Sequence, residues 1–322
     1  MKKKVCIASR LIHALLLTAG FTTTAFAQTD FWELLKGPLT GPVAAIVTNR
    51  NDVIFAGTFV GIGRSTDDGA SWKVDLSGIP VFALAINNAG HIFAGTLGNG
   101  VYRSTDQGET WNAVNDGLTN SAIFALTINS AQHLFAGTFD GGVFRSIDNG
   151  DNWAPINAGL TESFVTALAT NRAGHLFAGT NAGVFRSINN GDSWSFSNAG
   201  LPARFVFALV VNAADHLFAG TANDGVFRST DNGDSWDGVN VGLDAAVDVR
   251  ALTINAAGHL FAGATELNGG GVFRSLNNGD NWEAVNAGLT RLHVLALGFD
   301  RQVRAVFWRV RMVAVYFAAL AR

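Results

Sequence analysis

The chain has a single cysteine, Cys6, and only 22 lysine and arginine residues among 322. Cys6 lies in a segment that we expect to be removed, so a disulfide framework and cysteine chemistry are excluded from the mature protein. A chain of this length with 48% hydrophobic content can bury a core without disulfide bonds. No sustained 3.6-residue hydrophobic period follows the first segment, which argues against a helical domain.

The first 27 residues have the pattern of a secretory signal. A basic start at residues 2–10 precedes an apolar run at residues 11–20, and Ala25-Phe26-Ala27 supplies a small-residue cleavage site. We therefore expect a signal peptide at 1–27 and export to the periplasm, the cell surface or the medium. The alternative is an uncleaved anchor, but an apolar run of about ten residues is short against the roughly 20 that a spanning helix needs.

Loss of this segment would lower Lys+Arg from 22 to 18 against 25 Asp+Glu, which gives a net charge of −7. Only Lys36 and Lys73 would remain as lysines. So acidic a chain, without a basic cluster, argues against nucleic acid and anionic lipid as partners. We expect the mature chain to be a monomer that does not span a membrane.

A repeat of about 41 residues dominates the rest of the chain. Clear copies read HLFAGTFDGGVFR at 133–145, HLFAGTNAGVFR at 175–186, HLFAGTANDGVFR at 216–228 and HLFAGATELNGGGVFR at 259–274, with looser copies at 53–64 and 91–103. Each copy predicts four strands: Val-x-Ala-Leu-x-Ile, Leu-Phe-Ala-Gly-Thr, Gly-Val-Phe-Arg-Ser, and a fourth from a tryptophan to Asn-x-Gly-Leu. Four antiparallel strands in about 42 residues predict a β-propeller blade.

A turn of the pattern Ser-x-[Asp/Asn]-x-Gly-x-x-Trp follows the third strand of every copy. Its residues are Ser65, Asp67, Gly69 and Trp72; Ser104, Asp106, Gly108 and Trp111; Ser146, Asp148, Gly150 and Trp153; Ser187, Asn189, Gly191 and Trp194; Ser229, Asp231, Gly233 and Trp236; and Ser275, Asn277, Gly279 and Trp282. The serine and the Asp or Asn can accept backbone N–H groups, and the glycine permits the reversal. We expect each tryptophan to bury its ring between sheets.

This turn resembles the Asp-box, or BNR repeat, of sialidases, sortilin-type receptors, two-propeller xyloglucanases and the photosystem II assembly propeller. The resemblance implies the fold and leaves the function open. Asn189 and Asn277 depart from the aspartate of the pattern but keep a hydrogen-bond acceptor. A sialidase-like mechanism would need a tyrosine nucleophile. Tyr102 takes a core position, and Tyr316 lies in an irregular tail, so the sequence argues against it. The xyloglucanases use two propellers, and this chain has one.

The two ends of the repeat region are incomplete. Trp32-Glu33-Leu34-Leu35 matches a fourth strand without the three before it, and residues 294–297 begin a repeat that reaches no Asp-box. We predict an all-β fold: one seven-bladed propeller at 28–300 whose seventh blade is closed by the N-terminal strand and can be incomplete.

The tail at 301–322 departs from the repeat. When its codon junctions are read one frame over, the sequence permits LAGTDGGGVFRS, with leucine forced at Phe307/Trp308 and glycine at Met312/Val313. We hypothesise a frameshift, which the gene's nucleotide sequence tests directly. The alternative is a genuine strand pair at 303–315.

Residues that recur once in every blade are poor candidates for catalysis, because one active site needs one constellation. Five histidines begin the second strand, at His91, His133, His175, His216 and His259. Six arginines end the third, at Arg64, Arg103, Arg145, Arg186, Arg228 and Arg274. We interpret both sets as structural and expect no catalytic residue, metal or cofactor.

A specific site is expected on the face formed by the blade-to-blade loops and the loops between second and third strands. The non-repeating residues there are Asp140, Glu162, Arg204, Asp224, Asp244, Asp248, Arg250, Glu266 and Arg291, with Phe139, Phe164 and Phe205. The leading hypothesis is a non-catalytic scaffold that binds a protein, peptide or glycan on this face. The alternatives are a glycoside hydrolase or lyase that uses loop carboxylates, with Asp244, Asp248 and Glu266 as an acidic patch, and an assembly-factor role.

Overall fold

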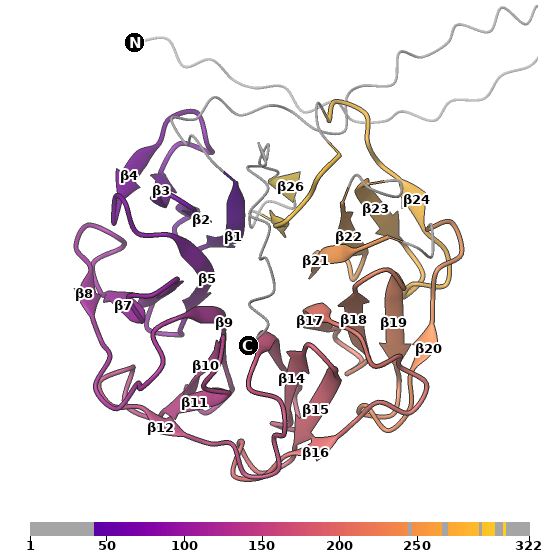
Figure 1. The fold of residues 1–322 in the computed structure, drawn as a ribbon. Helices are drawn as coiled ribbons and strands as arrows, with labels where there is room; N and C mark the ends of the chain where they lie inside the picture. Colours follow the sequence, from indigo (N-terminus) through magenta and orange to yellow (C-terminus); the bar gives the residue numbers. More distant parts are fainter. Residues whose placement is uncertain (1–41, 244–246, 266–269, 290–291, 300–304, 307–322) are drawn as a thin grey trace, which may run out of the picture.

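The computed structural model of the protein describes residues 42–243, 247–265, 270–289, 292–299 and 305–306. These residues form strands and turns without a helix. Six four-stranded sheets are arranged around a central axis, with first strands innermost and fourth strands at the rim (Figure 1). The predicted all-β propeller with four-stranded antiparallel blades is confirmed.

Each blade uses four consecutive strands paired in chain order. Blade one consists of β1 (Val43–Thr48), β2 (Ile54–Thr58), β3 (Gly61–Ser65) and β4 (Lys73–Asp75). Blade two consists of β5 (Val81–Ile86), β6 (Ile92–Thr96), β7 (Val101–Ser104) and β8 (Asn112–Ala113). Blade three consists of β9 (Ile123–Ile128), β10 (Leu134–Thr138), β11 (Val143–Ser146) and β12 (Ala154–Pro155).

The second half of the ring repeats this plan. Blade four consists of β13 (Val165–Thr170), β14 (Leu176–Thr180), β15 (Gly183–Ser187) and β16 (Ser195–Phe196). Blade five consists of β17 (Val206–Val211), β18 (Leu217–Thr221), β19 (Val226–Ser229) and β20 (Asp237–Gly238). Blade six consists of β21 (Val249–Ile254), β22 (Leu260–Ala264), β23 (Gly271–Ser275) and β24 (Glu283–Ala284).

The fourth strands are shorter than the sequence predicts. They begin one residue after the tryptophan and span two residues, or three in blade one. In blades three to six the tryptophan does not join its own sheet because its backbone N–H donates to the preceding blade, as Trp194 does to the carbonyl of Ala158 at 2.8 Å. The Asn-x-Gly-Leu segment forms a turn, in which Leu160 N–H donates to the carbonyl of Asn157 at 3.0 Å.

The prediction of a seven-bladed propeller is wrong, because the described residues form six blades. After blade six there is only a two-stranded sheet of β25 (Gly298–Phe299) and β26 (Ala305–Val306). The physical reason lies in the sequence after residue 300, which does not contain the Leu-Phe-Ala-Gly-Thr and Gly-Val-Phe-Arg-Ser patterns of second and third strands. Ala296 packs against blade one and Phe299 against Phe261 of blade six, so this segment lies between the first and last blades. The signal at 1–27, the Trp32 segment and most of the tail at 301–322 lie outside the described residues.

The six Asp-box turns share one hydrogen-bond pattern. In blade two, the backbone N–H of Gly108 donates to Ser104 Oγ at 2.8 Å, and Ser104 Oγ donates to Asp106 Oδ1 at 2.8 Å. The hydroxyl of Thr110 donates to the other oxygen of Asp106 at 2.6 Å. In blade four, Asn189 replaces the aspartate and accepts from Ser187 Oγ in the same way. The predicted roles of the serine, the Asp or Asn and the glycine are confirmed.

Hydrogen bonds of the turn lower the carboxyl pKa. The pKa of Asp106 falls to about 2, chiefly because the Thr110 hydroxyl donates to it, with further bonds from the Thr110 backbone and Ser104. The pKa values of Asp67, Asp148 and Asp231 are lowered for the same reason, with a side chain four residues later as the largest cause. The ionised form therefore stabilises these turns.

Tryptophan side chains join each blade to the one before it. Trp153, Trp194, Trp236 and Trp282 are 3–6% exposed, so the predicted burial is confirmed in blades three to six. Their indole N–H groups donate to carbonyls of the preceding blade, as Trp194 does to Ile156 at 2.6 Å.

In blades one and two the tryptophans, Trp72 and Trp111, are only half-buried. Blade one has a shorter exit, with nine residues from Trp72 to Val81 against twelve from Trp111 to Ile123. The exit segment of blade one, which is the neighbour of Trp111, therefore differs in length from the exit segments that neighbour the tryptophans of blades three to six.

Arginines make a second contact between blades. Arg145 Nη1 donates to the carbonyl of Asn190 and to Asp192, both at 2.8 Å, and these residues lie in the Asp-box turn of the next blade. Arg103, Arg186 and Arg228 bind the following turn in the same way. These contacts bear out the structural interpretation of the arginines in blades two to five.

Glycines of the second strands make the third contact. In blades one to five, a Cβ built on this glycine would lie 2.6–2.9 Å from a side-chain carbon at the first residue of the next blade's first strand, and in blade six it would lie 2.6 Å from Val294 in the segment that follows the blade. The pairs are Gly57 with Val81, Gly95 with Ile123, Gly137 with Val165, Gly179 with Val206, Gly220 with Val249 and Gly263 with Val294. Glycine is needed here for space, because the strands pack closer than a methyl group allows. We call these tryptophan, arginine and glycine contacts the inter-blade seam.

Replacement of Gly179 by alanine is expected to destabilise the protein by about 1–3 kcal/mol, because the added methyl group overlaps Val206. A shift of the urea unfolding midpoint measures this effect. Gly238→Ala is the control, because its Cβ would meet Phe227 at 3.6 Å and Asn240 at 3.7 Å, both ordinary contact distances. Val206→Ala should restore part of the loss in the Gly179→Ala background, and equal effects of the two glycine substitutions would contradict the steric account.

Acid stability tests the Asp-box carboxylates. Asp106 has a folded-state pKa of about 2 against an ordinary 3.8, so its contribution is present above about pH 4 and is lost as the pH falls toward 2. Asp106→Asn should therefore show a smaller fall of Tm from pH 5 to pH 2.5 than the wild type. Asn189→Asp should show a larger one. The idea fails if both variants follow the wild-type pH curve.

Candidate functional site

A β-bulge interrupts the first strand of every blade at the same position. In blade two, Val81 pairs with Thr96 and Ala83 with Gly95, which leaves Phe82 without a cross-strand partner. A bulge re-aims the side chain of its extra residue and commonly lies beside functional sites. The bulge residues are Ala44, Phe82, Phe124, Thr166, Phe207 and Arg250. Each blade thus has one variable residue at the bulge of its first strand, the innermost strand of the blade, whereas the neighbouring positions of the repeat are regular.

Phenylalanine side chains at and beside these bulges contact one another on one side of the propeller. Phe82 lies 4.9 Å from Phe59 and 5.2 Å from Phe124, measured between ring centroids. Phe124, Phe139 and Phe164 form a triangle with centroid distances of 6.0, 5.2 and 4.9 Å. Rings at such separations attract one another through their edges and faces.

The chain of rings continues into blades five and six. Phe164 lies 5.9 Å from Phe205, which stacks on Phe207 at 5.9 Å with an interplanar angle of 15°. The guanidinium carbon of Arg250 lies 3.9 Å from the centroid of Phe207, in a cation–π contact. We name this set the aromatic arc: Phe59, Phe82, Phe124, Phe139, Phe164, Phe205 and Phe207.

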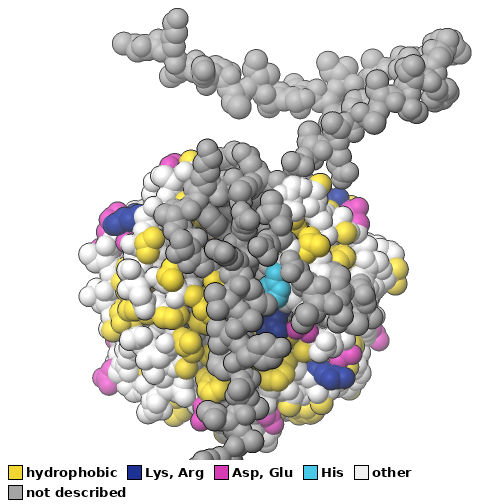
Figure 2. All heavy atoms as spheres, turned by 45° about the horizontal axis from the view of Figure 1, so that its top comes forward, with side chains coloured by type: hydrophobic (Ala, Val, Ile, Leu, Met, Phe, Trp, Pro, Cys, Tyr) yellow, Lys and Arg dark blue, Asp and Glu magenta, His cyan; other side chains and the backbone are white. Residues whose placement is uncertain are grey.

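The aromatic arc is accessible to solvent. Phe139 is 45% exposed and Phe205 38%, and the other five rings are half-buried. Figure 2 shows hydrophobic side chains gathered around the central part of one face, with basic and acidic side chains beside them. Contiguous exposed apolar surface of this kind marks interaction sites.

The predicted charged residues border the arc and contact one another. Arg204 pairs with Asp224 at 3.0 Å, and Arg250 pairs with Asp248 at 2.9 Å. Asp140 accepts the hydroxyl of Ser163 at 3.1 Å, beside Glu162. Asp244, Glu266 and Arg291 lie outside the described residues, so the predicted acidic patch is represented here only by Asp248.

Sequence reasoning found part of the arc. Phe139, Phe164 and Phe205 stand in loops and were predicted, but Phe82, Phe124 and Phe207 were missed because they lie inside first strands. Phe59 was missed because it lies in the copy of the repeat at 53–64, which matches the repeat pattern less closely. The usable signal is the second position of Val-x-Ala-Leu, which varies from blade to blade while its neighbours repeat.

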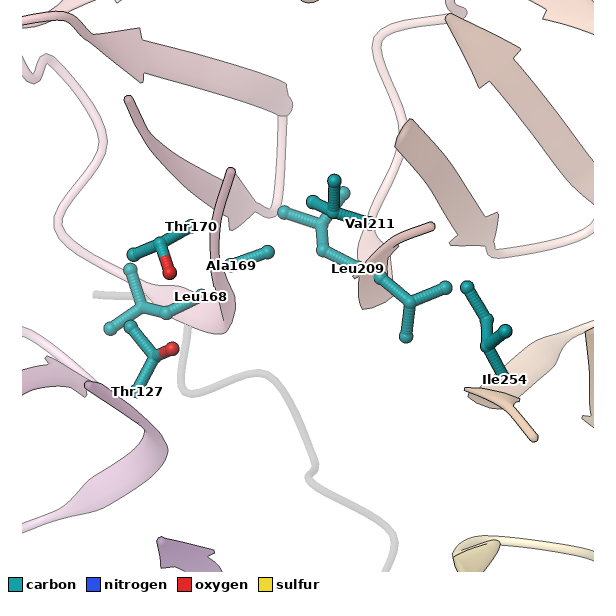
Figure 3. A pocket seen from close by; sticks show the side chains of 8 residues that line it. Thr127, Leu168, Ala169, Thr170, Leu209, Val211 and Ile254 are labelled. Atoms are coloured by element: carbon teal, nitrogen blue, oxygen red, sulfur yellow. The ribbon is translucent and has the colours of Figure 1, made fainter. Parts of the chain in front are cut away.

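The central axis contains an apolar hollow of about 330 Å³. In Figure 3, Leu168, Leu209 and Ile254 project into it from different first strands, with the hydroxyl groups of Thr127 and Thr170 beside them. Among the residues whose structure is described, the hollow is lined by apolar side chains and threonines.

The repeated histidines stand where each first-to-second strand turn ends. The backbone N–H of His133 donates to Asn129 Oδ1 at 2.9 Å, and the other four repeat this bond with the asparagine four residues earlier. Within the described ranges, no group of three or more His, Cys, Asp or Glu side chains could hold a metal ion. The part of the chain with described structure also has no helix long and apolar enough to cross a membrane.

Among known families, the BNR/Asp-box repeat matches residues 102–113. No curated protein sequence matches the chain significantly. Among solved structures, an extracellular domain assigned to the one component system BT4673 of B. thetaiotaomicron is 14% identical, with a TM-score of 0.70. The match covers 85% of this chain and 38% of that one, so this chain spans well under half of that protein's length.

Two further structures share the fold. YCF48 bound to D1 peptide is 15% identical over 84% of this chain and 90% of that one, with a TM-score of 0.66. The GH74 xyloglucanase from Xanthomonas campestris is 17% identical over 83% and 50%, with a TM-score of 0.68. These similarities show the fold alone, and the Asp-box turn pattern identifies the repeat. The chain is therefore a β-propeller built from BNR/Asp-box repeats.

Proposed function

We propose that the protein is an exported, non-catalytic propeller that binds a segment of a protein or peptide on the aromatic arc. The observation that carries this proposal is the contact of seven partly exposed phenylalanine rings across five blades. Exposing so many apolar rings on one face is unfavourable in water unless a partner covers them. The signal pattern at 1–27 supports a site of action in the periplasm, at the cell surface or outside the cell, with the propeller acting as a monomer.

The angles between the rings favour a peptide over a glycan. Four successive pairs along the arc meet at 58°, 50°, 77° and 78°, and only the last pair of the arc, Phe205 and Phe207, is nearly parallel at 15°, so most of the surface presents ring edges and faces in turn. Sugars stack on flat, exposed ring faces, whereas a corrugated apolar surface accepts interdigitating side chains. The peptide-bound state of YCF48 is a precedent on the same fold for peptide binding.

The charged side chains fit this proposal better than a glycosidase. Hydrolysis needs one carboxyl group as acid and another as base or nucleophile at a set separation. Asp224 and Asp248 are each engaged by an arginine, and Asp140 by a serine hydroxyl. The fold similarity to the xyloglucanase makes hydrolysis the competing candidate, with Asp244 and Glu266 as its carboxylates.

Peptide display tests the proposed function. The mature chain should select linear peptides rich in apolar residues from a random dodecamer library. Phe139→Ser/Phe205→Ser should weaken these peptides at least about tenfold, because each lost ring removes an apolar contact of about 1 kcal/mol or more. Fluorescence anisotropy with labelled peptides measures the change.

Phe196→Ser is the matched control, because Phe196 is 58% exposed on the outermost strand β16, away from the arc. Its substitution should leave affinity unchanged. Selected peptides that bind the arc variant and the wild type equally well would contradict the proposal. So would glycoside turnover that is lost in Asp244→Ala or Glu266→Ala.

A further inference from the structure

The middle of the aromatic arc combines rings with carboxylates. Phe124, Phe139 and Phe164 contact one another there, and Asp140 directly follows Phe139 in the chain. Asp140 accepts the hydroxyl of Ser163 at 3.1 Å, which places the loop that carries Glu162 beside it. Two acidic residues therefore belong to the loops that carry the most contacted rings of the arc, Asp140 directly after Phe139 and Glu162 two residues before Phe164.

The charges along the arc are balanced at one end and unbalanced in the middle. At the end in blades five and six, each arginine meets an aspartate, Arg204 with Asp224 and Arg250 with Asp248. Neither Asp140 nor Glu162 forms an ion pair with any residue for which the structure gives a position. Among the described residues, the charges of the arc without an ion-pair partner are thus negative, and they belong to the loops that carry Phe139 and Phe164 of the phenylalanine triangle.

The chain itself shows how this face holds a cation. Arg250 lies over the ring of Phe207 at 3.9 Å and pairs with Asp248 at 2.9 Å. The middle of the arc has the same two kinds of group, since Asp140 and Glu162 lie in the loops that carry Phe139 and Phe164 of the triangle. A cation gains from both, since the ring quadrupole and the carboxylate act in the same direction.

We propose that the middle of the arc binds a lysine or arginine side chain of an otherwise apolar, extended segment of a partner protein. This inference rests on the proposed function and specifies its ligand. The apolar neighbours of the cation cover the rings on either side, while its aliphatic stem packs on the triangle and its charged end reaches the two carboxylates. The predicted net charge of −7 for the mature chain would further speed the approach of a basic segment.

Three labelled peptides test this inference. Each carries fluorescein at its N-terminus and an amide at its C-terminus, with the core Leu-Val-Lys-Val-Leu, Leu-Val-Gln-Val-Leu or Leu-Val-Glu-Val-Leu. By fluorescence anisotropy at low salt, the Lys peptide should bind about tenfold more tightly than the Gln peptide, and the Glu peptide most weakly. The advantage of lysine should shrink as salt is raised.

Charge removal on the protein gives the matched comparison. Asp140→Asn/Glu162→Gln should reduce the advantage of the Lys peptide to about twofold or less while the Gln peptide binds as before. Asp116→Asn/Asp237→Asn removes two exposed carboxylates that lie off the arc, and it should preserve the advantage.

The outcomes separate this inference from the proposed function. Equal binding of the three peptides, with loss of all three in Phe139→Ser/Phe205→Ser, would overturn the cation site and keep the binding face. An advantage for lysine that the control pair removes as well would place the effect in overall charge and also overturn the site. Absence of binding by all three peptides would count against both proposals.

Discussion

The inter-blade seam is the constraint on which the rest of this structure depends. The outer strand of most blades spans only two residues and pairs little with the third strand. Each blade therefore depends on contacts with the next blade. The buried indole of Trp194 crosses to blade three, Arg145 of blade three binds the turn of blade four, and Gly179 lets Val206 approach. Because these contacts repeat, the geometry of one seam is passed around the ring.

The seam and the bulges together turn a repetitive scaffold into a single face. The glycine contact fixes the first residue of each first strand against the previous blade, and the bulge directs the second residue out of the ladder. Phe82 and Phe124 therefore meet at 5.2 Å although 42 residues separate them. The packing of neighbouring blades thus brings residues of separate repeats together into one surface that spans five blades.

Much of the fold follows from the sequence, because its signals are local. The Asp-box pattern predicts hydrogen bonds within eight residues, and the second and third strands have the predicted bounds in clear copies such as Leu134–Thr138 and Gly183–Ser187. The aromatic arc could be predicted only in part. The direction of the Phe124 side chain depends on a β-bulge, and the rings that it contacts depend on how the blades pack. A strand pattern in the sequence encodes neither. The seventh blade was overpredicted because Val294 begins a repeat correctly and later residues do not continue it.

Native-state hydrogen exchange of Trp194→Phe tests the seam most directly. This substitution keeps an aromatic ring but removes the N–H that donates to Ile156 at 2.6 Å. We predict faster amide exchange in blades three and four, including the bulged strand β13, with unchanged exchange in β1 and β21. A uniform change over all six blades, or no change in any, would contradict the claim that neighbouring blades hold each other and the face that they share.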